Sequence, residues 1–379
     1  MKKLLIIFLI IQPFLDISYT LNLYNINSVV RGLFFLIATI YLIKNKKYKE
    51  VLFVYIPMII YVLMYLFYYK YSLFNAFTLA FKFFYLPICM LFFYNYKDKI
   101  DNKYLVYTLI FYLLIYYISL IFNIGSDIYE RGVKKEGFKG LYNSINELST
   151  IIIILLGISL NYLNNKKKYV ISIILLVLSI FLSMTLGTKV ILGGIIILIL
   201  YFMYKPFKEY FNSKNVKGKV FITLSIVVVA FFSAFLITNT TTYKNAEVQK
   251  KYFKVKNVFS FNYVNKVIFN NRFSFVPKNH KIYASSNIIN KIFGINENIV
   301  RKDVEIDLFD VFYKYGLIGF MLIIIYILYI LYKSKLKAFY KFLFILLLLI
   351  SEASGHVLLC PAVSLYFGII VYYGKRKAW

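Results

Sequence analysis

Long apolar runs separated by short polar connections dominate this chain. A run of about 17 to 22 apolar residues is the length that an α-helix needs to cross the hydrocarbon layer of a membrane. The pattern predicts about twelve transmembrane helices, near residues 4–20, 28–43, 51–69, 73–94, 104–122, 145–163, 169–186, 189–204, 220–238, 308–332, 338–353 and 357–373. The expected fold class is therefore an all-α polytopic membrane protein.

One long polar segment interrupts this pattern late in the chain, from Asn239 to Asp307. It divides the chain into three expected parts. Residues 1–238 hold the first nine transmembrane helices with short loops, residues 239–307 form the long loop, and residues 308–379 hold the last three helices and the C-terminus. The basic, apolar start of the chain is similar to a signal peptide, but no small-residue cleavage site follows. We therefore expect a retained first helix.

Composition excludes a soluble globular protein. Of the 379 residues, 61% are hydrophobic and 20% aromatic, and so few polar groups cannot cover a globular surface. The net charge of +29 would suit nucleic acid, but its placement indicates membrane topology instead. Every second connection is rich in lysine, namely residues 2–3, 44–49, 97–103, 166–168, 205–219, 333–337 and 375–377.

This alternation orients the chain. Under the positive-inside rule the lysine-rich connections and both termini are cytoplasmic, and the long loop is extracytoplasmic. Contact of the lysines with anionic membrane lipids is a secondary role. The abundance of Ile, Lys, Asn, Tyr and Phe is typical of an AT-rich bacterial genome and favours a bacterial cell membrane. Cys89 and Cys360 are far apart in sequence and predict no disulfide framework.

Two outward segments are long enough for chemistry, and both are basic. One runs from Asn123 to Asn143 and contains Arg131. The long loop carries twelve Lys or Arg against five Asp or Glu between Asn239 and Asp307. Such basic segments at the outer membrane face predict an anionic ligand, and we expect no nucleic acid there.

Lys189 and Arg272 are the leading candidates for binding that anion. Lys189 stands in the first turn of a predicted helix, where free backbone N–H groups and an ammonium suit a phosphate. The alternative is an interfacial lysine behind an N-cap at Thr188. Arg272 is one of two arginines in the long loop, and arginine is the better bidentate ligand for pyrophosphate. The alternative there is a solvated side chain.

Acidic residues supply candidate bases. Glu147 follows Ser144 at the spacing of a capping box, so it has a structural alternative to catalysis. In the stretch KDVEIDLFD, Glu305 and Asp307 are candidates for deprotonating a sugar hydroxyl, and Asp303, Asp307 and Asp310 share one face if the stretch is helical. Two alternatives remain for this stretch, which are favourable electrostatics at a helix start and a divalent-metal site.

His356 is a further candidate acid or base. It follows Glu352 by four residues, and that carboxylate could orient its ring. A buried histidine without a catalytic role is the alternative. The chain lacks a zinc-binding constellation, a Walker loop and a Gly-x-Ser-x-Gly elbow, so the sequence indicates no cytoplasmic nucleotide-driven activity.

The chain resembles the superfamily of O-antigen polymerases and O-antigen ligases, in its Gram-positive polysaccharide polymerase branch. Four stretches carry the resemblance, together with the late outer loop: GLYNSINELS, SMTLGTKVILGG, FGINENIVRKDVEIDLFDVFYKYGLIG and SGHVLLCPAVS. Ligases of this superfamily commonly carry a His-Asn pair upstream of the Gly-x-x-Gly that is here Gly316 and Gly319. Alignment on Gly316 places Glu305 at the position of that histidine, which favours a polymerase. An Arg-x10-Gly motif of some polymerases is absent after Arg131 and Arg272.

The resemblance implies a C-type glycosyltransferase-like enzyme that works without a metal or a nucleotide sugar. Its substrate would be an undecaprenyl-pyrophosphate-linked oligosaccharide, and its partners a flippase and a chain-length regulator of the same pathway. We therefore expect a polymerase of lipid-linked repeat units for capsule, exopolysaccharide or O-antigen. Arg272, Lys189 and Arg131 would bind the pyrophosphate, and Glu305, Asp307, Glu147 or His356 would serve catalysis. The alternatives are a flippase for the same lipid-linked oligosaccharide, ligase-type transfer to another acceptor, and a non-enzymatic assembly partner.

Overall fold

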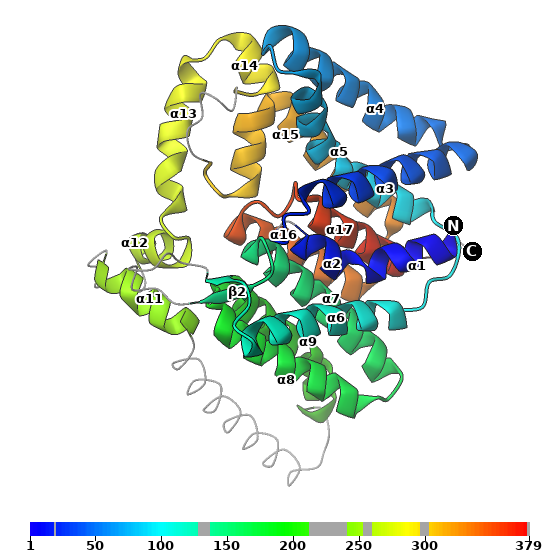
Figure 1. Cartoon of the computed structure of the whole chain (residues 1–379), viewed down its shortest axis with the longest axis vertical. Coiled ribbons are helices and arrows are strands. Elements are labelled where there is room, and N and C mark those ends of the chain that lie inside the picture. Colours follow the sequence, from blue (N-terminus) through cyan, green and yellow to red (C-terminus); the bar gives the residue numbers. More distant parts are fainter. Residues whose placement is uncertain (19, 128–136, 212–240, 253–259, 296–302, 377–379) are drawn as a thin grey trace. The chain divides into compact units, whose positions relative to one another are not determined.

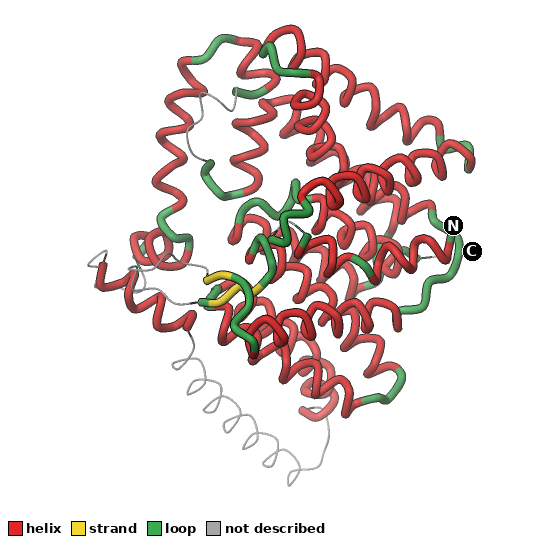
Figure 2. The backbone as a smooth tube through the Cα atoms, in the orientation of Figure 1, coloured by secondary structure: helices red, strands yellow, loops and turns green. Residues whose placement is uncertain are grey.

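The computed structural model describes residues 1–18, 20–127, 137–211, 241–252, 260–295 and 303–376 (Figure 1). Among these residues helices predominate, and strands are confined to one short pair (Figure 2). The pair joins β1 (Ser126–Asp127) to β2 (Phe138–Gly140) in antiparallel order, with Ser126 opposite Gly140. The predicted all-α class is confirmed.

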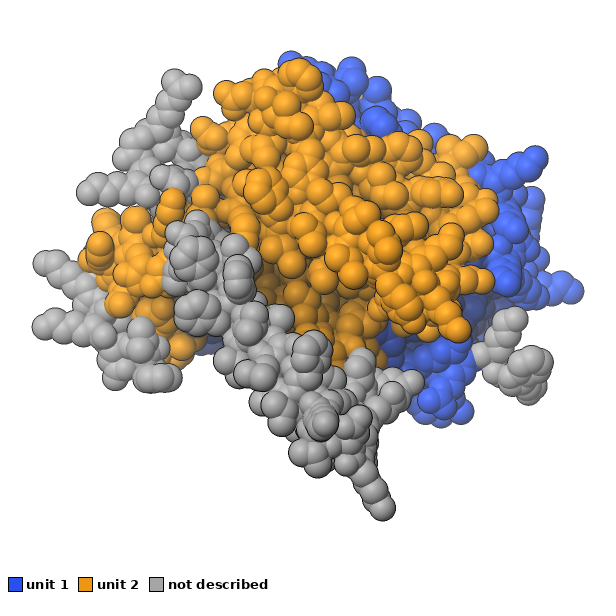
Figure 3. Space-filling model, turned by 90° about the horizontal axis from the view of Figure 1, so that it is seen from below, with its two compact units in different colours: residues 1–5, 14–100, 269–379 blue, residues 6–13, 101–268 orange. Residues whose placement is uncertain are grey.

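The described residues form two compact units, which Figure 3 distinguishes by colour. The first unit contains residues 1–5, 14–100 and 269–379, and the second contains residues 6–13 and 101–268. The boundary between the units crosses the N-terminal helices α1 (Lys2–Ile10) and α2 (Gln12–Ile17).

Helix α5 (Leu73–Asn95) is the centre of the first unit. It packs against α3 (Tyr24–Lys44), α4 (Tyr48–Leu63), α15 (Asp307–Ser334) and α17 (Pro361–Gly374), and α17 also contacts α16 (Ala338–Ser354). A Cβ at Gly368 of α17 would lie 2.4 Å from the Phe93 ring of α5. The glycine therefore allows close packing of the two helices, as small residues do in membrane proteins.

Helix α7 (Ile145–Asn165) has the same role in the second unit. It contacts α6 (Lys103–Ile121), α8 (Tyr169–Leu186) and α9 (Lys189–Phe211). Its apolar side chains from Ile151 to Ile158 are almost fully buried. A Cβ at Gly194 of α9 would come within 2.3 Å of the Ile153 side chain, so this helix pair also packs closely through a glycine.

Seven described helices are long and apolar enough to cross a membrane. They are Ile26–Lys44, Tyr48–Tyr68, Leu73–Asn95, Lys103–Ile121, Ile145–Asn165, Tyr169–Leu186 and Asp307–Ser334, and two shorter apolar helices are Lys189–Tyr204 and Pro361–Gly374. All nine correspond to predicted spans, whereas the predicted helix at 220–238 lies outside the described residues. The chain is a polytopic membrane protein, and the total of about twelve spans stays a prediction.

Two predicted helices are interrupted. The first, expected over 4–20, divides at Ile11 into α1 and α2. Pro13 has no backbone N–H to continue the hydrogen-bond ladder across this point. Helix α15 contains a non-helical residue, Gly316, with φ of 66°. A Cβ there would lie 2.4 Å from the backbone nitrogen of Gly294, so the kink accommodates a neighbouring segment.

The long polar segment contains its own helical elements. These are α11 (Thr241–Tyr252), α12 (Phe261–Tyr263), the π-helical turn η2 (Val264–Ile268), the 3-10 turn η3 (Arg272–Phe275), α13 (Val276–Ser285) and α14 (Ile288–Phe293). The first three belong to the second unit and the last three to the first unit. The segment 239–307, which was predicted as a single loop, therefore contributes helical elements to both units.

Candidate functional site

Charged side chains gather in the first unit where three segments meet. The segments are η3, the stretch 303–314 that leads into α15, and the end of α16 with the residues that follow it. We call the set the charged cluster: Arg272, Asp303, Glu305, Asp307, Asp310, Lys314, Glu352 and His356. Val304 and Ile306, which alternate with the acidic residues of this stretch, are buried in an apolar group with Tyr313.

Arg272 is the buried cation of the charged cluster. Its side chain is 8% exposed, and its Nε and Nη2 atoms both lie 3.1 Å from Oε2 of Glu305. Its Nη1 donates a hydrogen bond to the carbonyl oxygen of Ala353. The Glu305 side chain is 36% exposed, so the carboxylate end of this ion pair is reachable from solvent. The structure therefore joins a predicted pyrophosphate ligand to a predicted base.

Asp303 lies between two basic groups. Its Oδ2 is 2.8 Å from Nζ of Lys314 and 3.8 Å from Nε2 of His356. Asp303, Asp310 and His356 offer ligand atoms within 4.8 Å of one another, so these residues could hold a metal ion. The Lys314 ammonium already neutralises Asp303, and a divalent cation would have to displace it. The expected absence of a metal stays a prediction.

Asp307 and Asp310 hold backbone segments together. Oδ2 of Asp307 accepts hydrogen bonds from the N–H groups of Val357 and Leu358, which follow α16. Asp310 accepts from the N–H groups of Val304 and Glu305 at 2.8 and 3.0 Å. Both side chains are buried. Their oxygens therefore shape the site, and Asp307 is less accessible to a substrate hydroxyl than Glu305.

The stretch from Asp303 to Ile306 is not helical, because α15 begins only at Asp307 and Glu305 has a φ of 61°. The condition for a common face of Asp303, Asp307 and Asp310 is therefore not met. His356 also has a left-handed backbone, with a φ of 59°. Such conformations are uncommon for residues other than glycine and concentrate at functional sites. Next to it, a Cβ at Gly355 would lie 2.4 Å from the carbonyl oxygen of Glu305. The two segments therefore approach at backbone distance.

His356 is paired differently from our expectation. Glu352 accepts hydrogen bonds from the Leu308 N–H and the Ser351 hydroxyl, whereas the carboxylate beside His356 is that of Asp303. Partial burial lowers the pKa of His356 below its ordinary value, although the nearby Asp303 carboxylate opposes that shift. The imidazole is therefore neutral near pH 7 and can accept a proton. Its side chain is 47% exposed.

The other predicted site residues belong to the second unit. Ser144 is the N-cap of α7, and its hydroxyl accepts from the N–H of Glu147. This is the serine half of the predicted capping box, and a catalytic role of Glu147 stays a prediction. Lys189 begins α9, and its ammonium donates to the side-chain oxygen of Gln249 and the carbonyl oxygen of Val267. Arg131 lies outside the described residues.

Lys314 is the member of the charged cluster that sequence reasoning missed. It stands inside the apolar run 308–332, where an ionisable residue is costly and usually has a partner. A lysine inside an apolar run was therefore the feature of the sequence that could have identified Lys314. Its partner Asp303 lies eleven residues earlier, before the helix begins.

Comparison with known proteins shows to which family the chain belongs. A search of curated protein sequences finds no match. A family model described as "O-antigen ligase like membrane protein" matches residues 1–257 and 238–374, two overlapping stretches that cover nearly the whole chain. The polytopic helical fold agrees with that description. The chain therefore belongs to the family of O-antigen ligase like membrane proteins.

Proposed function

We propose that this protein polymerises undecaprenyl-pyrophosphate-linked oligosaccharide repeat units at the outer face of the bacterial cytoplasmic membrane. Membership in the family supports a multi-pass membrane enzyme of the glycosyltransferase type in O-antigen or related polysaccharide biosynthesis. The position of Glu305, where ligases commonly carry a histidine, favours a polymerase. A flippase that delivers the repeat units and a chain-length regulator are the partners we expect.

One observation carries this proposal, which is the buried Arg272 paired with the partly exposed Glu305. A pyrophosphate that approaches this pair competes for the guanidinium, because arginine binds phosphate groups through two parallel hydrogen bonds. The competition frees the Glu305 carboxylate. Binding of the donor would thus release the base that the transfer needs.

The reaction follows from this exchange. The hydroxyl oxygen of the acceptor repeat unit attacks the anomeric carbon of the donor sugar, and the bond from that carbon to the pyrophosphate oxygen breaks. Undecaprenyl pyrophosphate leaves with the bonding electrons, and Arg272 stabilises its charge. Glu305 accepts the proton of the attacking hydroxyl, with His356 as the neighbouring alternative. Lys189 and Arg131 are proposed as further pyrophosphate ligands.

Reconstitution tests the proposal. The full-length protein, in liposomes that contain only lipid-linked repeat units, should produce polymer that remains attached to undecaprenyl pyrophosphate, also in the presence of a chelator. Arg272→Ala should lower turnover by at least about 100-fold, because its guanidinium stabilises the developing charge. Lys281→Ala is the matched control, since Lys281 is an exposed cation on the neighbouring helix α13. Polymer formation by Arg272→Ala at the wild-type rate would contradict the assignment.

Ligase-type transfer is the second candidate, because the description of the matched family names O-antigen ligase. The two activities differ in the acceptor. A ligase leaves isolated repeat units unpolymerised and moves glycan only when another acceptor is added. A flippase makes no glycosidic bond in either assay and only changes the membrane leaflet in which the lipid-linked unit lies.

A further inference from the structure

Exposed apolar side chains flank the connection between α4 and α5 in the first unit. Phe67 belongs to the π-helical turn η1 (Met64–Tyr68), which continues α4, and Leu73 and Phe74 begin α5. Each of the three side chains is between 68 and 79% exposed. All three belong to the candidate membrane spans that contain α4 and α5. In a chain that crosses a membrane, such side chains contact lipid acyl chains.

The residues of the connection itself are typical of a bilayer surface. Residues 68–71 read Tyr-Tyr-Lys-Tyr, and Lys70 is exposed. Tyrosine is enriched at membrane–water interfaces because its ring is apolar and its hydroxyl is polar, and a lysine there extends its ammonium to water. The connection therefore lies at the headgroup boundary of one leaflet, which is the extracytoplasmic leaflet under the predicted topology.

Helix α14 of the long polar segment is bonded to this same connection. Asn287 is its N-cap, and Nδ2 of Asn287 donates a hydrogen bond to the Tyr68 hydroxyl at 2.5 Å. The Tyr69 hydroxyl lies 3.1 Å from Oδ1 of Asn290. Figure 1 shows α14 beside the end of α4. These contacts hold α14 at the depth of the bilayer surface, although it belongs to a segment that the sequence indicates as a polar loop.

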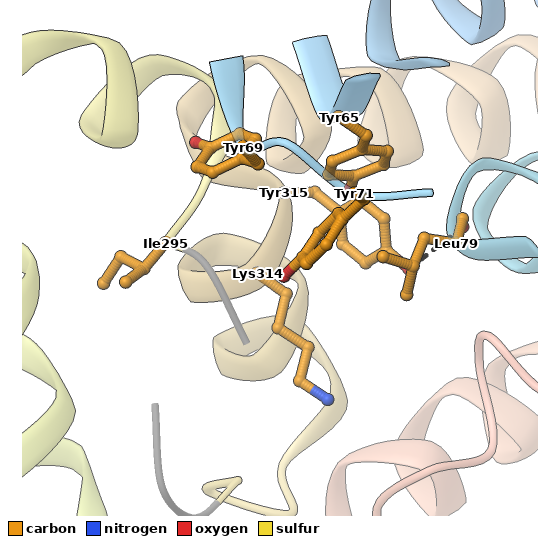
Figure 4. Close-up of a pocket in the computed structure, with 7 residues that line it drawn as sticks. All are labelled: Tyr65, Tyr69, Tyr71, Leu79, Ile295, Lys314 and Tyr315. Carbon is orange, nitrogen blue, oxygen red and sulfur yellow. Dashed lines mark hydrogen bonds between the residues drawn. The ribbon is translucent and has the colours of Figure 1, made fainter. Parts of the chain in front are cut away.

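The other end of α14 is fixed against α15. The Ile295 N–H donates to the carbonyl oxygen of Tyr313 at 2.8 Å, and a Cβ at Gly294 would lie 2.0 Å from the carbonyl oxygen of Lys314. Figure 4 shows Ile295, Lys314 and Tyr69 around one small pocket. Helix α14 therefore has a fixed position between the α4–α5 connection and α15.

The start of α14 presents an apolar side chain beside the lipid-facing residues. Ile288 is 67% exposed, and Ile289 is 36% exposed. A singly exposed apolar residue is ordinary on a protein surface, but the place of Ile288 is not. Ile288 follows Asn287, and Phe67 precedes Tyr68, the residue to which Asn287 is hydrogen-bonded. Ile288 therefore continues a surface that already faces lipid.

We propose that α14 is an interfacial anchor, which inserts Ile288 among the lipid acyl chains of the leaflet that contains the α4–α5 connection. Helices at a membrane surface bury their apolar side about 5 to 10 Å into the boundary between headgroups and acyl chains. The inference goes beyond the proposed function and does not depend on it. The anchor also sets the depth of Lys314, and so keeps the charged cluster near the headgroup phosphates.

Fluorescence quenching by lipid tests the anchor. Trp379 is the only tryptophan of the chain, so Trp379→Phe gives a dark background in which Ile288→Trp places one reporter on α14. Because Ile288 is exposed, the larger ring displaces no packed side chain. The full-length protein is placed in phosphatidylcholine nanodiscs with or without bromine on the acyl chains near the headgroup. We expect bromine to lower the emission at least about twofold, since the ring would lie among these carbons, and aqueous iodide to have little effect.

Two further reporters in the same background serve as controls. Phe74→Trp, at a 79% exposed residue of α5, should be quenched by brominated lipid. Lys281→Trp, at an exposed lysine of α13, should be quenched by iodide instead.

Three results would overturn the anchor. Iodide quenching of Ile288→Trp as strong as that of Lys281→Trp would place α14 in water. Protection of Ile288→Trp from both quenchers would mean that protein, such as a second copy of the chain, covers it. A Phe74→Trp reporter that brominated lipid does not quench would remove the lipid-facing surface from which the depth of α14 is inferred. Because the assay needs no turnover, its outcome is separate from that of the polymerase assay.

Discussion

Arg272 in the first unit and Lys189 in the second are both cations at the start of a helical element, yet their surroundings differ. Arg272 binds the carboxylate of Glu305, with an imidazole and a second carboxylate nearby. Lys189 donates to two neutral oxygen atoms, one from the Gln249 side chain and one from the backbone of Val267. A basic residue at the start of a helical element therefore indicates chemistry only together with its neighbours. Arg272 has groups that can move a proton beside it, whereas Lys189 connects α9 with α11 and η2.

Among the variants that test this difference between Arg272 and Lys189, we expect Glu305→Gln to lose the most turnover. Glu305→Gln keeps an oxygen that accepts from Arg272 but removes the proton acceptor, so turnover should fall by about 10² to 10⁴. The melting temperature should fall by a few degrees, because the buried Arg272 guanidinium loses its counter-charge. Initial rates of polymer formation with purified variants measure the change. Glu247→Gln, at a carboxylate on α11 in the second unit, is the control. Unchanged turnover in Glu305→Gln would mean that Glu305 is not the base, and the proposed chemical difference between Arg272 and Lys189 would be wrong.

The next effect concerns stability at Asp307. Asp307→Ala leaves the buried N–H groups of Val357 and Leu358 without their acceptor, and each unsatisfied group costs about 1 to 3 kcal/mol. We expect the thermal unfolding temperature in detergent to fall by several degrees. Asp307→Asn retains one acceptor oxygen and should fall less. If Asp307→Asn melts like the wild type but makes no polymer, Asp307 and not Glu305 is the base.

A smaller effect is expected at Lys189. Lys189→Ala should lower turnover about tenfold, because one charge-assisted contact to the pyrophosphate is lost. Lys189→Arg keeps the cation and should restore most of the rate. Gln249→Ala removes an acceptor of Lys189 without removing the charge, and it separates anion binding from local packing. A rate loss in Gln249→Ala as large as in Lys189→Ala would assign Lys189 to structure alone.

The smallest effect is the pH dependence of His356. Its pKa is lowered in the folded protein by burial, so between that value and the ordinary value of about 6.5 the unfolded chain binds the extra proton. Stability should therefore fall as the pH drops from about 7 through this window. Thermal unfolding at several pH values compares wild type with His356→Gln. The decline should be weaker in the variant, and an identical decline would contradict a neutral His356.

The bounds of a helix were predicted closely where an apolar run alone determines them. The run predicted at 169–186 is Tyr169–Leu186, and the run at 145–163 is Ile145–Asn165 with its capping serine at Ser144. The kink at Gly316 could not be read in the same way. It exists because the backbone of Gly294 lies against α15, a contact between segments about 20 residues apart.

The residues of the candidate site could be predicted from the sequence, but which of their side chains contact one another could not. The acidic run, Arg272 and His356 stood out as polar groups in an apolar chain. The partner of His356 was assigned wrongly to Glu352, because helical spacing suggests neighbours four residues apart. The chain leaves the helix after Ser354, and the left-handed backbone of Gly355 and His356 redirects the ring toward Asp303.

The sequence by itself determined that this is a helical membrane protein, because long apolar runs have no other stable arrangement in a bilayer. It also identified the polar segments in which chemistry is expected. Only the tertiary structure decided that Arg272 meets Glu305, that Asp307 secures the residues after α16, and that four tyrosines line a pocket beside Lys314. These groups come from segments tens to hundreds of residues apart. Their meeting depends on helix packing and backbone kinks, which no local pattern of residues encodes.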